Sequence, residues 1–112
     1  MKIKDIQKWE ESFTKQKGIP QGEERAFKIA LCKLMEEVGE VAEAILEENW
    51  DEILAEVSDV IIFACKIANV AEKFHVSDEL SKVLRRKIKY VESKTYNKSK
   101  EKFNKPFSKE FK

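Results

Sequence analysis

Two pairs of acidic residues, each set into a repeat of apolar residues at helical spacing, constrain the fold of this chain more than any other feature. The first pair is Glu37 and Glu40, and the second is Glu56 and Asp59. A spacing of three puts both members of a pair on one face of a helix, about one turn apart. The apolar stripes comprise Phe27, Leu31, Leu34, Val38, Val41 and Ile45 on the earlier helix, and Ile53, Val57, Val60, Ala64, Ile67 and Ala71 on the later one.

The two acidic pairs lie on equivalent flanks of these stripes. At about 100° per residue, Glu37 lies about 90° from the centre of its stripe and Glu56 about 70°. Glu40 and Asp59 lie further round on the same flank, at about 150° and 130°. Two antiparallel helices packed stripe to stripe keep equal flanks on one side, and the heights of the pairs match to about 4–5 Å. We therefore expect the four carboxylates to converge.

Four converging carboxylates repel one another. Two unit charges about 6 Å apart cost roughly 3 kcal/mol at an effective dielectric constant near 20. Such a cluster needs either raised pKa values or divalent cations. Oxygen ligands without histidine or cysteine suit Mg²⁺, with Mn²⁺ as the second choice.

The hydrophobic repeats predict an all-α fold, a four-helix bundle built around a central antiparallel hairpin. The expected helices span residues 3–17, 23–48, 51–74 and 77–96, with Asp51 as the N-cap of the third. No β signal is evident. We expect one helical domain over 1–96, followed by a basic tail over 97–112. Two alternatives are open for this tail. It is either flexible, or it forms a strap that docks on a neighbouring molecule through its phenylalanines.

Composition limits the classes of function. The chain has 112 residues with a formal net charge of +1, so no overall field favours a nucleic acid polymer or a membrane surface. The two cysteines, Cys32 and Cys65, lack metal-site spacing and suit a reducing compartment. The charged start, with Lys2 and Lys4, does not resemble a signal peptide, and no apolar run suits a membrane span. We expect a cytoplasmic protein.

The third predicted helix is hydrophobic on nearly all sides. Ile62, Phe63 and Cys65 lie well off its main stripe, and a helix of this kind is buried on several faces. Four helices in so short a chain bury it with difficulty. This favours a homodimer or homotetramer, and the alternative is a monomer whose first and fourth helices cover that surface.

The acidic repeats resemble those of the MazG-like, all-α nucleoside triphosphate pyrophosphohydrolases. That family carries an E-x-x-E pair and an E-x-x-D pair, here within Glu36-Glu37-Val38-Gly39-Glu40-Val41 and Glu56-Val57-Ser58-Asp59-Val60, with 15 residues between the pairs. The likeness extends from Trp9-Glu10-Glu11 to Val83-Leu84-Arg85-Arg86-Lys87, over roughly residues 3–96.

The resemblance implies Mg²⁺-dependent cleavage of a nucleoside triphosphate between its α and β phosphates, which gives a monophosphate and pyrophosphate. In that reaction Glu37, Glu40, Glu56 and Asp59 would hold the ions. It further implies a role in removing aberrant nucleotides. Glu36 is the candidate general base for the attacking water, and the alternative is a solvated glutamate on the wet face of the helix.

Two lysines and two aromatic residues complete the candidate site. Lys87 falls inside the apolar stripe of the fourth helix with Lys94 nearby, and a substrate phosphate would explain a lysine there. The alternative is a lysine at a helix edge whose ammonium reaches solvent. Relatives have an asparagine where this chain has Val91. Trp9 and Phe13 could stack on the nucleoside, as first-helix aromatics do in relatives, or anchor the core.

Two other functions stay open. A phosphoribosyl-ATP pyrophosphohydrolase shares an acidic helix and a similar Asp-bearing third helix. A non-catalytic helical oligomerisation module would carry the same acids as surface residues, although matching flanks on both helices argue against it.

Overall fold

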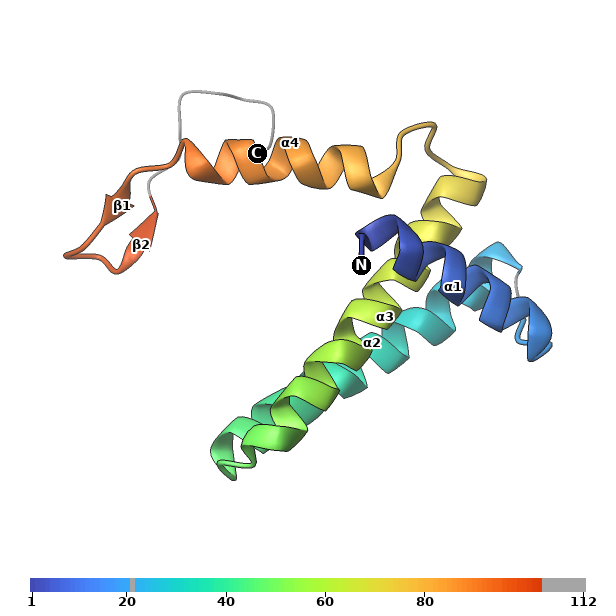
Figure 1. Ribbon diagram of the computed structural model, residues 1–112, viewed down its shortest axis with the longest axis horizontal. Coiled ribbons are helices and arrows are strands. Elements are labelled where there is room, and N and C mark those ends of the chain that lie inside the picture. The colour runs from blue at the N-terminus through green and yellow to red at the C-terminus, as the bar shows by residue number, and fades with distance from the viewer. Residues whose placement is uncertain (21, 104–112) are drawn as a thin grey trace. The chain divides into compact units, whose positions relative to one another are not determined.

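The structure, a computed structural model, describes residues 1–20 and 22–103 (Figure 1). Its helices are α1 (Ile3–Gln16), α2 (Glu23–Leu46), α3 (Trp50–Phe74) and α4 (Leu80–Glu92), and its strands are β1 (Tyr96–Asn97) and β2 (Lys102–Phe103). The predicted all-α fold is confirmed. The chain divides into two compact units, Met1–Ser77 and a second that starts at Asp78, and each is described by itself. None of the described helices combines the length and apolar character that crossing a membrane requires.

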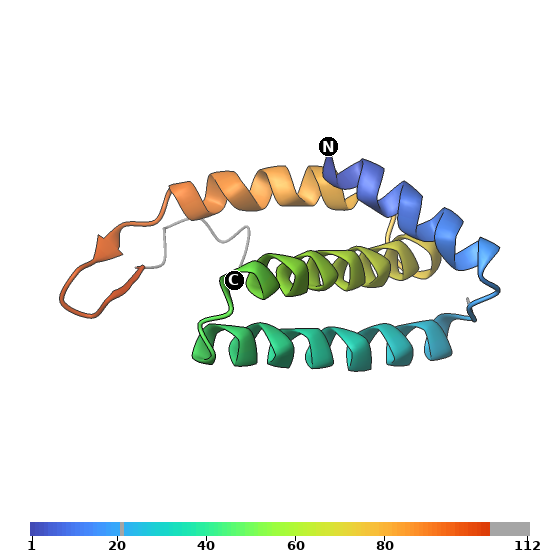
Figure 2. The same ribbon diagram turned by 60° about the horizontal axis from the view of Figure 1, so that its bottom comes forward.

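Helices α2 and α3 form the predicted hairpin and lie side by side (Figure 2). The chain leaves α2 through Glu48, whose φ of 56° lies in the left-handed region. The Glu48 amide donates to the Ile45 carbonyl at 3.1 Å and the Asn49 amide to the Ala44 carbonyl at 3.0 Å, which satisfies the end of α2. Helix α3 then begins at Trp50 with Asn49 at the N-cap position, so the prediction of Asp51 as N-cap is wrong. Asp51 instead lies in the first turn, where a carboxylate stabilises a helix.

The face of α2 that packs against α3 is rotated from the predicted stripe. Ala26, Ala30 and Ala44 are buried, whereas the larger residues Leu31, Val38 and Ile45 of the predicted stripe are exposed. At 100° per residue the line of the three buried alanines is displaced by roughly 85° toward Glu37. Small alanine side chains let two helix backbones approach closely, so these residues line the contact.

The same rotation applies to α3. Val57 and Ala64 of its predicted stripe are exposed, whereas Glu56 is half-buried and Val70 is buried. The prediction that the acids occupy the flank of the helix contact is therefore wrong in detail. Glu37 and Glu56 lie within the contact itself.

Helix α1 crosses α3 and is joined to it by polar side chains (Figure 1). The Gln7 amide donates to Asn69 Oδ1 at 2.9 Å and to Glu72 Oε2 at 2.6 Å. Lys66 Nζ lies 3.3 Å from Glu10 Oε2, and both side chains are buried. Asn69 Nδ2 donates to the other oxygen of Glu10 at 2.8 Å. One face of α3 is therefore covered by α1 through hydrogen bonds.

The second unit contains α4 and a short hairpin. Helix α4 ends at Glu92, before the predicted end at Tyr96, and β1 pairs antiparallel with β2. Asn97 Oδ1 accepts hydrogen bonds from Ser99 Oγ at 2.9 Å and the Lys100 amide at 3.2 Å, a local turn that competes with helix. The statement that the chain carries no β signal is wrong for this segment. The rest of the predicted tail, 104–112, lies outside the described residues.

Candidate metal centre

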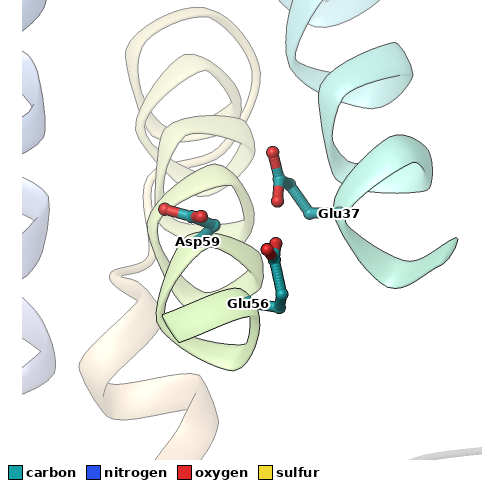
Figure 3. Close-up of side chains that lie close together, drawn as sticks. All are labelled: Glu37, Glu56 and Asp59. Atoms are coloured by element: carbon teal, nitrogen blue, oxygen red, sulfur yellow. The ribbon is translucent and has the colours of Figure 1, made fainter. Parts of the chain in front are cut away.

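Three of the four predicted carboxylates meet between α2 and α3. Glu37 projects from α2 toward Glu56 and Asp59 on α3 (Figure 3). One oxygen from each of the three lies within 4.8 Å of the others, and all three side chains are half-buried. The hairpin therefore brings residues 19 to 22 positions apart in sequence into one cluster.

Two further carboxylates border this cluster. Glu40 is close enough to hydrogen-bond with Glu37 and with Glu56. Glu52 is close enough to hydrogen-bond with Glu56 as well. The fourth predicted residue is thus adjacent to the other three. Glu52 did not enter the predicted set, although its spacing of four from Glu56 places it on the same helix face.

The crowding of carboxylates raises pKa values in the cluster. Hydrogen bonding with Glu40, then with Glu37, and then burial raise the pKa of Glu56 to about 8. For Glu37, the contact with Glu56 acts to lower the pKa, but burial and the neighbouring carboxylates of Glu40 and Asp59 outweigh it, so the pKa is raised. Both groups therefore favour a bound proton, or another cation in its place.

The oxygen atoms of the cluster suit a divalent cation. Glu37 Oε2 and Glu56 Oε2 are buried, and neither accepts a hydrogen bond from the part of the chain that the structure describes. Buried oxygen atoms of this kind need a partner, because desolvation without one is costly. A set of carboxylates without histidine or cysteine is the donor set that Mg²⁺ and Mn²⁺ prefer.

The part of the chain that contains this hairpin matches a known protein family. The profile of the MazG nucleotide pyrophosphohydrolase domain matches residues 25–97, which is more than half of the chain. The chain belongs to this family. No curated protein and no solved structure matches it. The family resemblance predicted from the two acidic pairs is confirmed, and membership supports nucleotide pyrophosphohydrolase activity in general.

The matched region of the MazG domain contains α2, α3 and α4 but not α1. All the carboxylates of the cluster lie within it. The part of the predicted resemblance that involved Trp9 lies outside the match.

Glu36, the predicted general base, lies on the exposed side of α2. Its Oε2 is 3.4 Å from Lys33 Nζ, an ion pair in which both side chains are about half exposed. A pair of this kind is worth little in stability and leaves the carboxylate accessible to water. The catalytic role of Glu36 stays a prediction.

The two aromatic residues predicted to contact the nucleoside lie on the outer side of α1. Trp9 and Phe13 stack on each other with ring centroids 5.2 Å apart, and both are exposed. Gln7, Glu10 and Thr14 face α3 instead. Their exposure, 48% for Trp9 and 38% for Phe13, argues against the alternative of core anchors, and nucleoside contact stays a prediction.

The two predicted phosphate-binding lysines share one partner in the second unit. The Lys87 and Lys94 ammonium groups lie 4.9 Å and 5.1 Å from the centroid of the Tyr90 ring. Cation–π contacts hold both side chains beside a buried tyrosine. Their role toward phosphate stays a prediction.

Sequence reasoning missed the buried charges between α1 and α3. Lys66 interrupts the apolar run of α3 from Ile61 to Val70, which is a visible signal because lysine is rarely buried without a partner. Its partner, Glu10, belongs to another helix 56 residues away. Only the folded arrangement pairs them.

Proposed function

We propose that this MazG domain hydrolyses a nucleoside triphosphate between its α and β phosphates and releases a monophosphate and pyrophosphate. The reaction would depend on Mg²⁺, with Mn²⁺ as a substitute. The family supplies the general activity. The convergence of Glu37, Glu56 and Asp59 from two helices is the observation that carries the metal dependence. Removal of aberrant nucleotides from a cytoplasmic pool is the role that this activity would serve.

In the proposed reaction, Glu37, Glu40, Glu56 and Asp59 would hold the cation. A cation bound there would neutralise the triphosphate and lower the pKa of an attacking water. Glu36 accepts the proton from that water. Lys87 and Lys94 contact phosphate oxygens, where an ammonium group stabilises the negative charge of the transferred group.

The direct test is a panel of canonical and damaged nucleoside triphosphates assayed with Mg²⁺ for released pyrophosphate. We expect Glu56→Gln and Asp59→Asn to lower turnover by more than about 100-fold, because each removes a ligand of the cation. Glu43→Gln is the matched control, since Glu43 is an exposed acid on α2 outside the cluster. Release of orthophosphate from the terminal position would show that a different bond is cut and would contradict the proposal.

Cation binding can be tested without turnover. Mg²⁺ or Mn²⁺ should raise the melting temperature of the wild-type protein, because binding to the folded state alone stabilises it. Glu40→Gln and Asp59→Asn should abolish that increase. An unchanged melting temperature in the presence of either cation would favour the non-catalytic helical module instead.

We propose further that the chain forms a homodimer or homotetramer through an apolar face of the hairpin. This face consists of the exposed residues Leu31, Met35, Val38 and Ile45 of α2 and Leu54, Val57 and Ile61 of α3. Exposed apolar side chains gathered along two adjacent helices are typical of a protein interface. A second copy presents the same face, so one surface can bury the other around a two-fold axis.

A further inference from the structure

The first unit contains a cavity away from the carboxylate cluster, lined by residues of α1, α2, α3 and the loop after α1. Its volume is about 320 Å³, within the range of small-ligand sites. Its apolar wall includes Ala26 of α2 and Val70 and Phe74 of α3, and its polar wall includes Glu10, Lys66 and Asn69. Seven of the eleven lining residues are polar or charged, and fixed polar groups beside an apolar wall orient a bound organic ligand.

The polar wall is held rigidly. Lys66 Nζ is 3.3 Å from Glu10 Oε2 and 3.1 Å from Thr14 Oγ1, and Thr14 also donates to Glu10. These three residues are at least 94% buried. A buried ion pair contributes little net stability compared with an apolar substitute, so its presence in a cavity wall suggests a role in recognition.

This wall also retains capacity for a ligand. An ammonium group carries three N–H donors, and within the described residues Glu10 and Thr14 account for two of those on Lys66. Asn69 presents an amide to the same cavity and is fixed by its contact with Glu10 at 2.8 Å. Fixed donors and acceptors in a half-enclosed site are suited to the polar edge of a heterocycle.

The cavity and the carboxylate cluster lie along nearly the same face of α3. Asp59 and Lys66 are seven residues apart, which places them on nearly the same face of the helix and about 10.5 Å apart along its axis. This separation is comparable to that between the phosphates and the base of an extended nucleotide. The charge of the lining argues against a second phosphate, because three carboxylates (Glu10, Glu11, Glu72) outnumber two lysines (Lys66, Lys73).

We propose that this cavity binds the nucleobase of the triphosphate whose phosphates are held at the carboxylate cluster, with Lys66 and Asn69 facing the polar edge of the base and Phe74 facing its ring. This inference rests on the proposed function, and it names the cavity that would select the base of the substrate. Glu10 and Thr14 of α1 would hold Lys66 in place for that contact, at 3.3 Å and 3.1 Å from its ammonium group.

The test replaces an exposed residue of the cavity, so that folding is preserved. Phe74 is 40% exposed, and its ring is held by Lys73 at 5.3 Å. We expect Phe74→Ala to raise the KM for nucleoside triphosphates about tenfold, since loss of a base–aromatic contact costs roughly that order. The inhibition constant of inorganic tripolyphosphate, which has no base, should not change. Trp50→Ala is the control, because Trp50 is an exposed aromatic residue at the opposite end of the same helix.

An NMR titration of the wild-type protein would test base binding in this cavity without a variant. Titration with a nucleoside that lacks phosphates should shift the backbone NMR signals of Asn69, Val70 and Phe74 and leave those of Glu37 and Glu40 in place. An unchanged KM for Phe74→Ala in an active enzyme would overturn the inference and leave the proposed function standing, as would nucleoside-induced shifts confined to Trp9 and Phe13. Absence of pyrophosphate release from every triphosphate would instead overturn the proposed function.

Discussion

At the scale of single residues, Glu56 is the carboxylate whose pKa the neighbouring acids raise to about 8. It is surrounded by Glu37, Glu40 and Glu52, and one of its oxygen atoms is buried without a hydrogen bond from the described residues. Lone carboxylates on a helix surface would remain ionised at neutral pH, whereas this one retains its proton until about pH 8. The folded hairpin thus creates a demand for positive charge that either a proton or a cation can meet.

The raised pKa of Glu56 predicts how the stability of the folded protein depends on pH. In the unfolded chain Glu56 loses its proton near its ordinary pKa of 4.5, and in the folded protein only near 8. The folded state binds more protons between these values, so its stabilisation is complete below about pH 4.5 and is lost as the pH rises through about 8. We expect the melting temperature of the metal-free protein to fall when the pH is raised from about 5 to about 9.

Two controls accompany this measurement. Glu56→Gln should flatten the decrease, because the amide does not titrate. Saturating Mg²⁺ should also flatten it, since the cation replaces the proton. A melting temperature that rises over the same interval would show that the cluster does not carry the proposed charge repulsion.

At the scale of secondary-structure elements, α1 and α3 are joined mainly by buried polar groups, whereas α2 and α3 meet through small apolar residues. Hydrophobic repeats predicted the existence of all four helices, and the bounds of α1, α2 and α3 agree with prediction to within two residues. The rotation of α2 against α3 was predicted less well. Periodicity gives the centre of the apolar residues, but the closest helix contact follows the smallest residues, here Ala26, Ala30 and Ala44.

The buried ion pair between α1 and α3 predicts a large effect of one substitution. Lys66→Met should lower the free energy of unfolding by about 3–5 kcal/mol, because it leaves the Glu10 carboxylate buried without its cation. The double variant Lys66→Met with Glu10→Leu should lose less than the single variant. Urea denaturation followed by circular dichroism measures both.

An exposed ion pair on α2 is the matched control for this substitution. Lys28 and Glu24 are 2.8 Å apart, with side chains 73% and 82% exposed. Lys28→Met should therefore change the free energy of unfolding by less than about 1 kcal/mol. If Lys66→Met and Lys28→Met lowered the free energy of unfolding equally, burial of the unpaired Glu10 carboxylate would not be the cause of the loss.

At the scale of the whole molecule, the apolar face of the hairpin predicts self-association. The wild-type protein should have the mass of a dimer or larger assembly in light scattering coupled to gel filtration. Leu54 is 72% exposed on this face, and Leu54→Lys should shift the mass toward a monomer, because it places a charge in the proposed interface. Ser12→Lys, an exposed position on α1, should leave the mass unchanged. A monomeric wild-type protein at high concentration would refute the interface.

The sequence by itself determined the helical class, the hairpin and the family, because helical periodicity and the spacing within each acidic pair are local properties of a few adjacent turns. It also predicted that Glu37, Glu56 and Asp59 would meet, since an antiparallel hairpin with a short turn allows few arrangements. Glu52 could have been added by the same reasoning from its spacing.

Only the tertiary structure decided which face of each helix is buried and which distant residues pair. The position of Glu37 inside the helix contact depends on how closely the alanine-lined face of α2 approaches α3. The pairing of Lys66 with Glu10 depends on where α1 crosses α3. Both are set by packing between segments far apart in the chain. The cost of burying a charge does not appear in any single segment, because it depends on what the rest of the fold places beside it.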